Sequence, residues 1–271
     1  MTHNPIRPCP LCGGLRCRLC FPVPPFRVVR CVACSLVYLE NPPTVDPDLD
    51  SYHGRPDPDP GAYQPDGADP FLSFLFRLND ERIRVLRRFC PTGNLLDVGC
   101  GRGYFVKTAS EWGFDAMGID ASGTAVRYAG KELGVRAEHQ DLDGLVRTGK
   151  RFDAVTLWHV LEHFTDPVGE LRRIRSLLKE GGFCLVETPN LNSLKFMLSR
   201  RKWRGGNHPL YHRTFFTSKT LRKTLERAGY AGVLQIRVDY PSSGRKRTLS
   251  IIKRMLNRLD LDSFIDYAVK T

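Results

Sequence analysis

The stretch NLLDVGCGRG, residues 94–103, decides the fold. Its first half is a short apolar run typical of a buried strand, and its second half places glycine at 99, 101 and 103. Glycine permits the tight turn and close backbone approach that a nucleotide-like ligand needs. The spacing is G-x-G-x-G, not the G-x-G-x-x-G of dinucleotide sites. Asp97 stands just before the glycines, and a carboxylate there suits an ammonium or sulfonium ligand better than a pyrophosphate, which it would repel.

Outward from this stretch the sequence alternates between strand and helix patterns. The predicted helices are 71–89, 104–113, 122–134, 167–179 and 217–229. The predicted strands are 94–99, 114–120, 135–141, 152–158, 182–188, 233–240 and 263–269. Such alternation predicts an α/β fold with a mostly parallel sheet and helices on both faces.

Acidic residues follow three successive strands of this predicted sheet. Asp120 ends the strand at 114–120, where the acid of nucleotide-binding folds accepts hydrogen bonds from both ribose hydroxyls. Asp141 ends the next strand and is placed to meet an adenine amino group. Each acid alone is an ordinary turn residue. Together with Asp97 they predict one ligand site, because parallel strands end at a common edge.

Cysteines are concentrated at the amino terminus, where six of the nine lie in the first 34 residues. Two C-x2-C pairs separated by eighteen residues have the spacing of a four-thiolate zinc site, with the ligands Cys9, Cys12, Cys31 and Cys34. We predict structural zinc there, because so short a segment needs a metal or an equivalent staple to fold. Cys17 and Cys20 form a third pair, whose surroundings alternate as in a packed hairpin strand. A metal-free hairpin of reduced cysteines is the alternative.

Residues 41–70 are rich in Pro, Asp and Gly, too Pro-rich for a helix or a central strand. We therefore expect a zinc-ribbon-like module at 1–40, a linker at 41–70 and a larger domain at 71–271. The opening MTHNPIRPCP has no apolar leader core, and no run approaches the roughly 18 apolar residues of a spanning helix, so a cytoplasmic location is expected. A net charge of +12 favours anionic partners: nucleic acid, an anionic membrane surface or a phosphorylated substrate.

The stretch HVLEH, residues 159–163, has the H-x-x-E-H pattern of some zinc proteases. It directly follows the predicted strand 152–158, and the next long helix begins only near Asp166. A zinc protease needs a third ligand and a helix that runs through the motif, and the sequence indicates neither. We therefore expect a short turn at the rim of the ligand site.

Five stretches in order resemble the successive motifs of class I S-adenosylmethionine-dependent methyltransferases, most closely the group with the ubiquinone-pathway O-methyltransferase: LLDVGCGRG, GID, QDLD, FDAVTLWHVLEHFTDP and LLKEGGFCLVETPN. The resemblance covers about residues 70–240. It implies a Rossmann-like fold with a seven-stranded, mostly parallel sheet whose antiparallel last strand would be 263–269. The amino-terminal pattern, with RCVACSLVYLENPP, is similar to a zinc-bearing extension of some bacterial members that act on sugars or natural products.

By this resemblance the cofactor is S-adenosylmethionine. Asp97, Gly99 and Gly101 would hold its methionine part, Asp120 its ribose, and Asp141 with Leu142 its adenine. The full set of expected cofactor residues is Asp97, Gly99, Cys100, Gly101, Gly103, Asp120, Ala121, Asp141, Leu142 and Trp158.

Methyl transfer to oxygen needs an aligned acceptor and a base. The candidate bases are His159, His163 and His212, the last in a segment that lies over the substrate in the family. The alternative is that His163 caps a turn and His212 packs locally. In the ubiquinone-pathway relatives a Glu stands in the place of His159 and helps to hold a divalent ion with the following Glu-His pair. Here residue 159 is His, so that ligand set is incomplete.

These features predict O-methylation of a small molecule or a sugar or glycan precursor. An acceptor with an anionic group would suit the positive charge of the protein. An RNA acceptor is the alternative, indicated by the zinc knuckles and the basic charge. Enzymes that methylate exocyclic amines of nucleic acids commonly have an Asn/Asp-Pro-Pro-Tyr type of motif. This chain has LWHVLEH in its place, which does not support an RNA acceptor of that kind. Residues 244–260 carry apolar residues on one helical face with Lys and Arg elsewhere, which suits either peripheral membrane contact or packing on the sheet.

Overall fold

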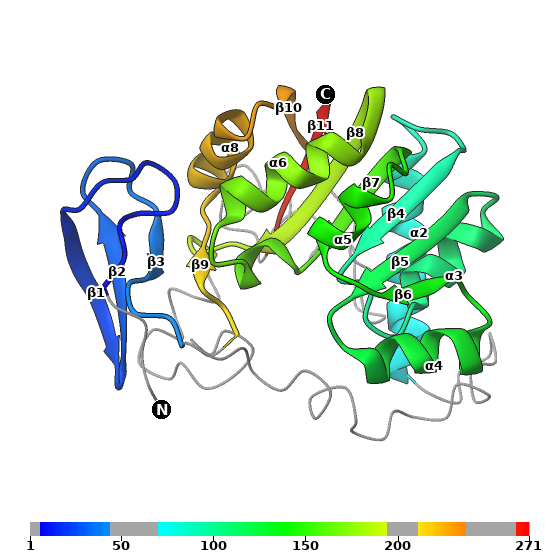
Figure 1. Ribbon diagram of the computed structural model, residues 1–271, viewed down its shortest axis with the longest axis horizontal. Coiled ribbons are helices and arrows are strands. Elements are labelled where there is room, and N and C mark those ends of the chain that lie inside the picture. Colours follow the sequence, from blue (N-terminus) through cyan, green and yellow to red (C-terminus); the bar gives the residue numbers. More distant parts are fainter. Residues whose placement is uncertain (1–5, 44–69, 194–210, 237–263, 271) are drawn as a thin grey trace, which may run out of the picture.

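The structure is a computed structural model that describes residues 6–43, 70–193, 211–236 and 264–270 (Figure 1). Most of the predicted linker 41–70 and all of the amphipathic segment 244–260 lie outside these residues. Within the described parts of the chain, no helix has both the length and the apolar character needed to cross a bilayer.

The larger domain is built on a seven-stranded sheet with the order β10-β11-β8-β7-β4-β5-β6. Its strands are β4 (Asn94–Val98), β5 (Asp115–Asp120), β6 (Ala137–His139), β7 (Phe152–Trp158), β8 (Leu178–Pro189), β10 (Ala231–Ile236) and β11 (Phe264–Lys270). Strands β4 to β8 pair in parallel, whereas β11 runs antiparallel to both β8 and β10. The structure thus confirms the mostly parallel sheet and the antiparallel last strand near 263–269.

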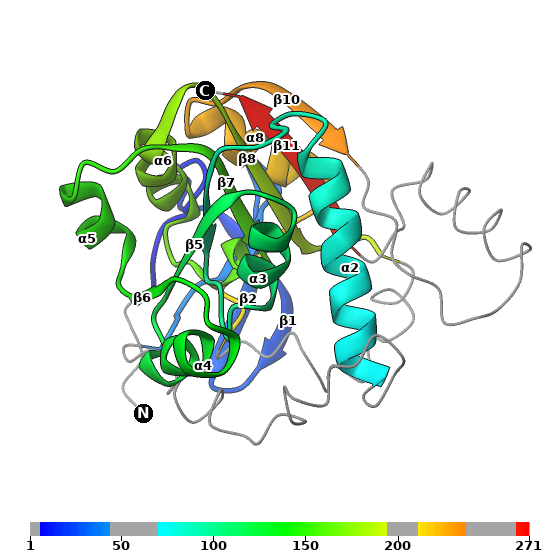
Figure 2. The same cartoon turned by 90° about the vertical axis from the view of Figure 1, so that its right-hand side faces the viewer.

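Helices cover both faces of this sheet (Figures 1 and 2). They are α2 (Pro70–Leu86), α3 (Tyr104–Glu111), α4 (Gly123–Leu133), α5 (Leu142–Arg147), α6 (Pro167–Leu177) and α8 (Ser218–Arg227). One hydrophobic cluster joins α5, α6 and α8 to the sheet through residues such as Leu145, Leu171 and Leu221. A second joins α2 and α3 to the opposite face through Ile83 and Phe105.

Local sequence signals explain where several of these helices begin. Ser122 caps α4 by accepting a hydrogen bond from the Ala125 amide, and Asp166 caps α6, with Pro167 at its first position. Helix α5 was not expected from the sequence: its Asp141 cap was assigned only to a strand end. Six residues are too few to show a helical period.

The amino-terminal residues form a second, four-stranded sheet with the order β1-β2-β3-β9. Strands β1 (Cys17–Val23) and β2 (Phe26–Cys31) make the predicted hairpin, and β3 (Val37–Leu39) pairs with β2. The fourth strand, β9 (Thr214–Phe215), comes from far along the chain and pairs antiparallel with β3. Figure 1 shows this sheet beside α6 and α8 at the edge of the larger domain, with β9 between the two parts.

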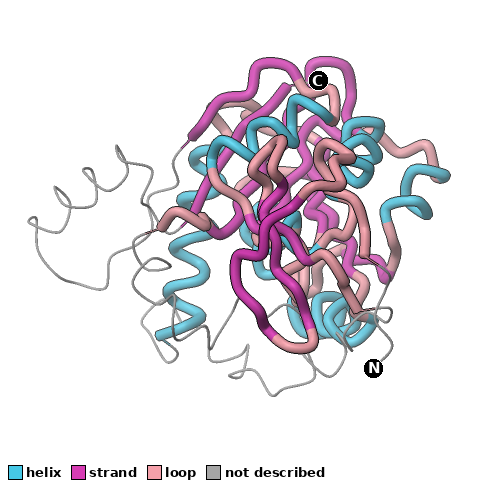
Figure 3. The backbone as a smooth tube through the Cα atoms, turned by 90° about the vertical axis from the view of Figure 1, so that its left-hand side faces the viewer, coloured by secondary structure: helices cyan, strands magenta, loops and turns pink. Residues whose placement is uncertain are grey.

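The two parts share one buried core. The largest hydrophobic cluster contains residues around the cysteine knuckles, such as Leu11, Leu36 and Tyr38, together with Leu161 and Phe216 of the larger domain. Figure 3 views the molecule from the side of the amino-terminal sheet and shows its strands lying across the loops of the larger domain. We call residues 6–43 the cysteine module.

Candidate functional site

The glycine loop after β4 has the left-handed backbone that its composition predicted. Gly99, Gly101 and Gly103 have φ of 69°, 54° and 82°. A Cβ on Gly99 would lie 2.5 Å from a methyl carbon of Val160, so glycine is required there for space as well as for conformation. The Gly99 and Cys100 amides donate to the Ile119 carbonyl at 2.8 and 3.0 Å, which joins the loop to β5.

Asp120 organises the loops at the end of β5. Its Oδ2 accepts a hydrogen bond from the Gly101 amide and its Oδ1 accepts one from the Ser122 amide, both at 2.8 Å. The side chain thus fixes the glycine loop and the start of α4 relative to each other. Ala121, beside it, places its carbonyl 3.0 Å from His139 Nε2.

Asp97 is buried at the end of β4 and accepts a hydrogen bond from Thr156 Oγ1 at 2.7 Å. Burial raises the pKa of Asp97 to about 7, and the hydrogen bond from Thr156 only partly opposes this shift. A cation bound against Asp97 would favour its ionised form. The carboxyl therefore has the electrostatic character expected for a site that binds a positively charged ligand.

The remaining expected cofactor residues lie at the same edge of the sheet. Asp141 caps α5 through a hydrogen bond from the Gly144 amide at 2.7 Å, and Leu142 is buried beneath it. The Trp158 ring, at the end of β7, packs 5.1 Å from Phe105, with the Arg82 guanidinium 4.5 Å from its centre. This edge carries acids, a glycine turn and an aromatic ring, as a nucleoside site requires.

His159 follows β7 directly and has a left-handed backbone with φ of 60°, rare for a residue other than glycine. Its Nε2 lies 2.9 Å from Glu187 Oε1, and its Nδ1 lies 3.7 Å from Glu162 Oε1. Glu187 also pairs with Arg82 from α2. A series of paired charges therefore runs from α2 to the end of β7, buried at Arg82 and Glu187 and partly exposed at His159.

The charges of this series decide which protonation states the site holds. Burial opposes protonation of His159, but its pairing with Glu162 and Glu187 outweighs burial and raises its pKa to about 9. Burial would raise the pKa of Glu162, but the neighbouring histidines lower it to about 2. His159 is thus an imidazolium at neutral pH, which favours a hydrogen-bond donor over the base that was one expectation for it.

His163 and His212 come together with Glu162, and their ligand atoms all lie within 4.8 Å of one another. The two imidazole rings meet edge to face with centroids 4.8 Å apart. His163 Nδ1 lies 2.9 Å from the Tyr211 carbonyl, which leaves Nε2 for a ligand. Burial lowers the pKa of His212 to about 4, so this ring is neutral at pH 7, as either a base or a metal ligand must be.

The HVLEH stretch forms a single 3-10 turn, η2 (Leu161–His163), not a continuous helix. This confirms the expected turn and removes the zinc-protease interpretation, which needs a long helix. The sequence did not indicate the third group beside Glu162 and His163. It comes from His212, nearly fifty residues later, and only the fold brings it there.

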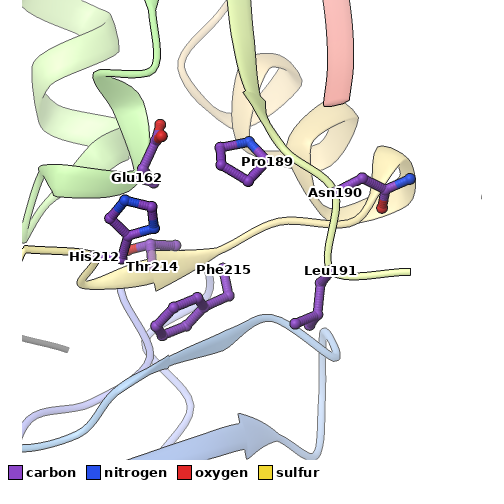
Figure 4. A pocket seen from close by; sticks show the side chains of 7 residues that line it. All are labelled: Glu162, Pro189, Asn190, Leu191, His212, Thr214 and Phe215. Carbon is purple, nitrogen blue, oxygen red and sulfur yellow. The ribbon is translucent and has the colours of Figure 1, made fainter. Parts of the chain in front are cut away.

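A small pocket opens beside this cluster (Figure 4). It is lined by Glu162, Pro189, Asn190, Leu191, His212, Thr214 and Phe215. Four of these residues are polar, Glu162, Asn190, His212 and Thr214, and Pro189, Leu191 and Phe215 form an apolar wall. Strands β4 and β7 are neighbours, so this pocket and the glycine loop share the carboxyl edge of the sheet.

Sequence reasoning missed the buried partners of His159. Glu187 is fully buried in β8, and Thr188 Oγ1 beside it donates to Glu162 Oε2 at 2.9 Å. A glutamate inside the apolar run GFCLVET was an available signal, because a buried charge needs a partner. Arg82 resembled every other basic residue of its helix, and nothing local distinguished it.

The four predicted zinc ligands come together at the tip of the cysteine module. Their sulfur atoms all lie within 4.8 Å, with Cys9 to Cys34 and Cys12 to Cys31 at 3.5 Å. Zinc–sulfur bonds of about 2.3 Å in a tetrahedron place sulfur atoms roughly 3.8 Å apart, so the cluster suits zinc. Cys17 and Cys20 lie on β1 outside the cluster, and Cys17 Sγ donates to Glu40 Oε1 at 3.0 Å.

The curated relatives of this chain include ubiquinone biosynthesis O-methyltransferases. The chain is 33% identical over 147 residues to a ubiquinone biosynthesis O-methyltransferase of Dinoroseobacter shibae, covering 50% of this chain and 58% of that protein. A second such enzyme, from Ralstonia nicotianae, is 30% identical over 141 residues, covering 48% of this chain and 59% of that protein. The chain thus spans little more than half the length of these curated relatives.

Solved structures with the same fold include a SAM-dependent methyltransferase from Archaeoglobus fulgidus, with a TM-score of 0.54 and 20% identity, covering 75% of this chain and all of that one. The plantazolicin methyltransferase BpumL, solved with S-adenosylhomocysteine, has a TM-score of 0.52 and 18% identity, covering 78% of this chain and 93% of that one.

A family model described as a methyltransferase domain matches residues 71–235, more than half of the 271-residue chain. The match includes the glycine loop, the acids at the strand ends, His159 and the β8 glutamate. The chain therefore belongs to the methyltransferase-domain family and has the Rossmann-like fold of the S-adenosylmethionine-dependent enzymes.

Proposed function

We propose that this protein transfers a methyl group from S-adenosylmethionine to a hydroxyl of a small molecule or a sugar or glycan precursor. The observation that supports this most is the shared edge of the sheet. The glycine loop with Asp97 and Asp120 lies at the ends of β4 and β5, and the Glu162, His163 and His212 cluster follows the neighbouring β7. A cofactor and an acceptor can meet there. The homology to O-methyltransferases supports oxygen as the atom methylated.

In this reaction the acceptor oxygen forms a bond to the methyl carbon while the bond from methyl to sulfur breaks. The sulfonium becomes the neutral thioether of S-adenosylhomocysteine, and the hydroxyl proton must leave. We assign the cofactor to the ten residues expected from the sequence, with Asp97 facing its positive end and Asp120 its ribose. His212 lines the pocket and is neutral at pH 7, so it is our candidate to accept the proton, although its lowered pKa makes it a weaker base than an ordinary imidazole.

The family resemblance implies a divalent ion in this region, and the residues present fit one. Glu162 Oε1 is buried and has no hydrogen-bond partner among the described residues. One carboxylate and two imidazoles are donors that suit zinc, manganese or iron. Glu162, His163 and His212 would hold the ion. The relatives have a glutamate ligand at the position of His159, and here His212 would supply that third ligand instead. An ion there would lower the pKa of the acceptor hydroxyl.

The first test is calorimetric binding of S-adenosylhomocysteine to the wild type and to Asp120→Asn. Losing charge-assisted hydrogen bonds worth about 1.5–3 kcal/mol should weaken binding at least tenfold. Asp115→Asn is the matched control, because Asp115 begins the same strand and its side chain is 62% exposed. Absence of binding by the wild type would refute the cofactor assignment.

The second test is release of S-adenosylhomocysteine from S-adenosylmethionine in a screen of hydroxylated acceptors, with and without a chelator. Turnover that a chelator abolishes and manganese alone restores would indicate an ion at the Glu162, His163 and His212 cluster, because manganese does not suit the four thiolates of the cysteine module. Failure of manganese to restore turnover in His212→Ala would assign His212 as a ligand of that ion. Turnover that survives the chelator but is lost in His212→Ala would assign it as the base. No turnover with any hydroxylated acceptor would count against O-methylation.

A further inference from the structure

The cysteine module contacts both segments that form the cluster of Glu162, His163 and His212. One segment is η2 with its continuation to Thr165, and the other is residues 211–215. Strand β9 of the second segment pairs with β3 of the module, matching Tyr38 with Thr214. His212, the candidate base, is therefore followed by Arg213 and then directly by β9, a strand of the sheet that the module forms.

We infer that Arg7 is a positioning residue through which the cysteine module holds His212 and Glu162 in place. Its guanidinium donates to three backbone carbonyls on three different segments. Nε donates to Leu39 of β3 at 3.0 Å, Nη2 reaches Arg213 at 3.5 Å, and Nη1 donates to Thr165. The aromatic ring of Tyr38 lies 5.6 Å from the guanidinium carbon.

Hydrogen bonds of the residues around His212 connect the Arg7 contacts to the site. The Leu39 amide donates to the Arg213 carbonyl at 2.9 Å, and the Arg213 amide donates to the Glu162 carbonyl at 2.8 Å. The Arg213 side chain donates to Thr165 Oγ1 at 2.6 Å. His212 is thus held between the module strand β3 and the turn that carries Glu162. A shift of either neighbour would move the imidazole.

The apolar wall of the pocket also rests on the module. Leu191 and Phe215, which line the pocket, belong to a small buried cluster with Phe26, Val28, Val37 and Leu39 of the module. Figure 4 shows both side chains directed toward the module ribbon. The module therefore supports the pocket on two sides, through backbone hydrogen bonds near His212 and through packing beneath Phe215.

The residues that Arg7 contacts, Leu39, Thr165 and Arg213, are not among the expected cofactor residues, most of which lie farther along the shared edge of the sheet. In the sheet order, β4, β5 and β6 lie beyond β7, on the far side of β8 from β11, and Figure 1 places β5 and β6 at the opposite side of the molecule from the module. A change at Arg7 should therefore disturb the acceptor pocket and leave cofactor binding intact. This separation distinguishes positioning from a general loss of fold.

The test uses diethylpyrocarbonate, which modifies neutral imidazole, with rates at each histidine read by mass spectrometry of peptides. His212 is 7% exposed, whereas His139 is exposed and serves as the internal reference. Arg7→Ala should raise the His212 rate relative to His139 by about 5- to 30-fold, as expected when local contacts of this size are lost. Arg7→Lys, which keeps the positive charge but has a single donor nitrogen that cannot reach all three carbonyls, should give an intermediate rate. Affinity for S-adenosylhomocysteine should stay within about twofold of wild type.

Two further variants keep the inference falsifiable. Arg18→Ala removes an exposed arginine of the same module and should leave the His212 rate unchanged. Thr165→Val replaces the hydroxyl that accepts from Arg213 by a methyl group and should also raise the His212 rate. This variant tests the same set of contacts if Arg7→Ala proves too unstable to study. An unchanged rate in Arg7→Ala, or a rise matched by an equal loss of cofactor binding, would overturn the inference. Neither readout requires methyl transfer, so the result does not depend on the proposed function.

Discussion

Replacing Arg82 by Met should expose how strongly the site depends on its buried charges. In the native structure Arg82 of α2 pairs with Glu187 of β8, and their side chains are only 6% and 0% exposed. The substitution leaves the Glu187 carboxylate in the interior with His159 Nε2, at 2.9 Å, as its main remaining partner. Solvent cannot screen a charge at such a position, so losing Arg82 destabilises the folded state to the extent that His159 does not compensate the Glu187 charge.

The expected loss of unfolding free energy is about 3 kcal/mol, the lower end of the 3–5 kcal/mol typical of a broken buried pair, because His159 still compensates part of the charge. Arg82→Met combined with Glu187→Gln removes both charges. The double variant should recover most of the loss and lie within about 1 kcal/mol of wild type. Arg84→Met on the same helix is the matched control, since Arg84 is 54% exposed in its pair with Glu81 and should change stability by less than about 0.5 kcal/mol.

Urea unfolding followed by circular dichroism measures all four chains, and equal m-values show that the denatured states are comparable. The reasoning fails if Arg82→Met unfolds within about 1 kcal/mol of wild type, or if the double variant is no more stable than the single one.

Three other predictions concern the cofactor loop, its acid and the cysteine cluster. Because burial raises the pKa of Asp97 to about 7, the carboxyl loses its charge as the pH falls through 7. Affinity for the cationic S-adenosylmethionine should therefore fall by up to about tenfold per pH unit below pH 7. Calorimetry at pH 6, 7 and 8 should show this dependence, and Asp97→Asn should remove it. Gly99→Ala, with its left-handed φ and its clash with Val160, should abolish measurable S-adenosylhomocysteine binding, whereas Gly130→Ala, with open space around it, should bind normally. Atomic absorption should find about one more zinc ion per chain in the wild type and in the control Cys20→Ser than in Cys31→Ser. An equal zinc content in the wild type and Cys31→Ser would contradict the assignment of zinc to the cysteine cluster.

Much of the fold could be predicted because its signals are local. The apolar runs, the helix starts near Ser122 and Asp166 and the tight glycine turn each depend on a few neighbouring residues. The cysteine cluster was predictable for a related reason, since its spacing alone indicates the chemistry. The position of Asp120 at a strand end followed from the strand pattern.

The acceptor side was less predictable because its contacts join distant parts of the chain. Helix α2 supplies Arg82, β8 supplies Glu187, and β7 ends in His159, so the buried charges meet only after the sheet forms. The sequence named His212 as a candidate base but did not place it beside Glu162. Strand β9 has two residues, too few for any periodic signal, although it joins both parts of the molecule.

That short strand affects how related proteins could be recombined. The sheet of the cysteine module takes its fourth strand from residues 214–215, so the module is not a detachable cassette at the amino terminus. A chimera that exchanges only the first forty residues would pair β3 of one protein with β9 of another. Its Phe215 would also pack against module side chains from the other protein. Amino-terminal segment and β9 should therefore be inherited together, and swaps that carry both should keep a working pocket more often than swaps that carry one.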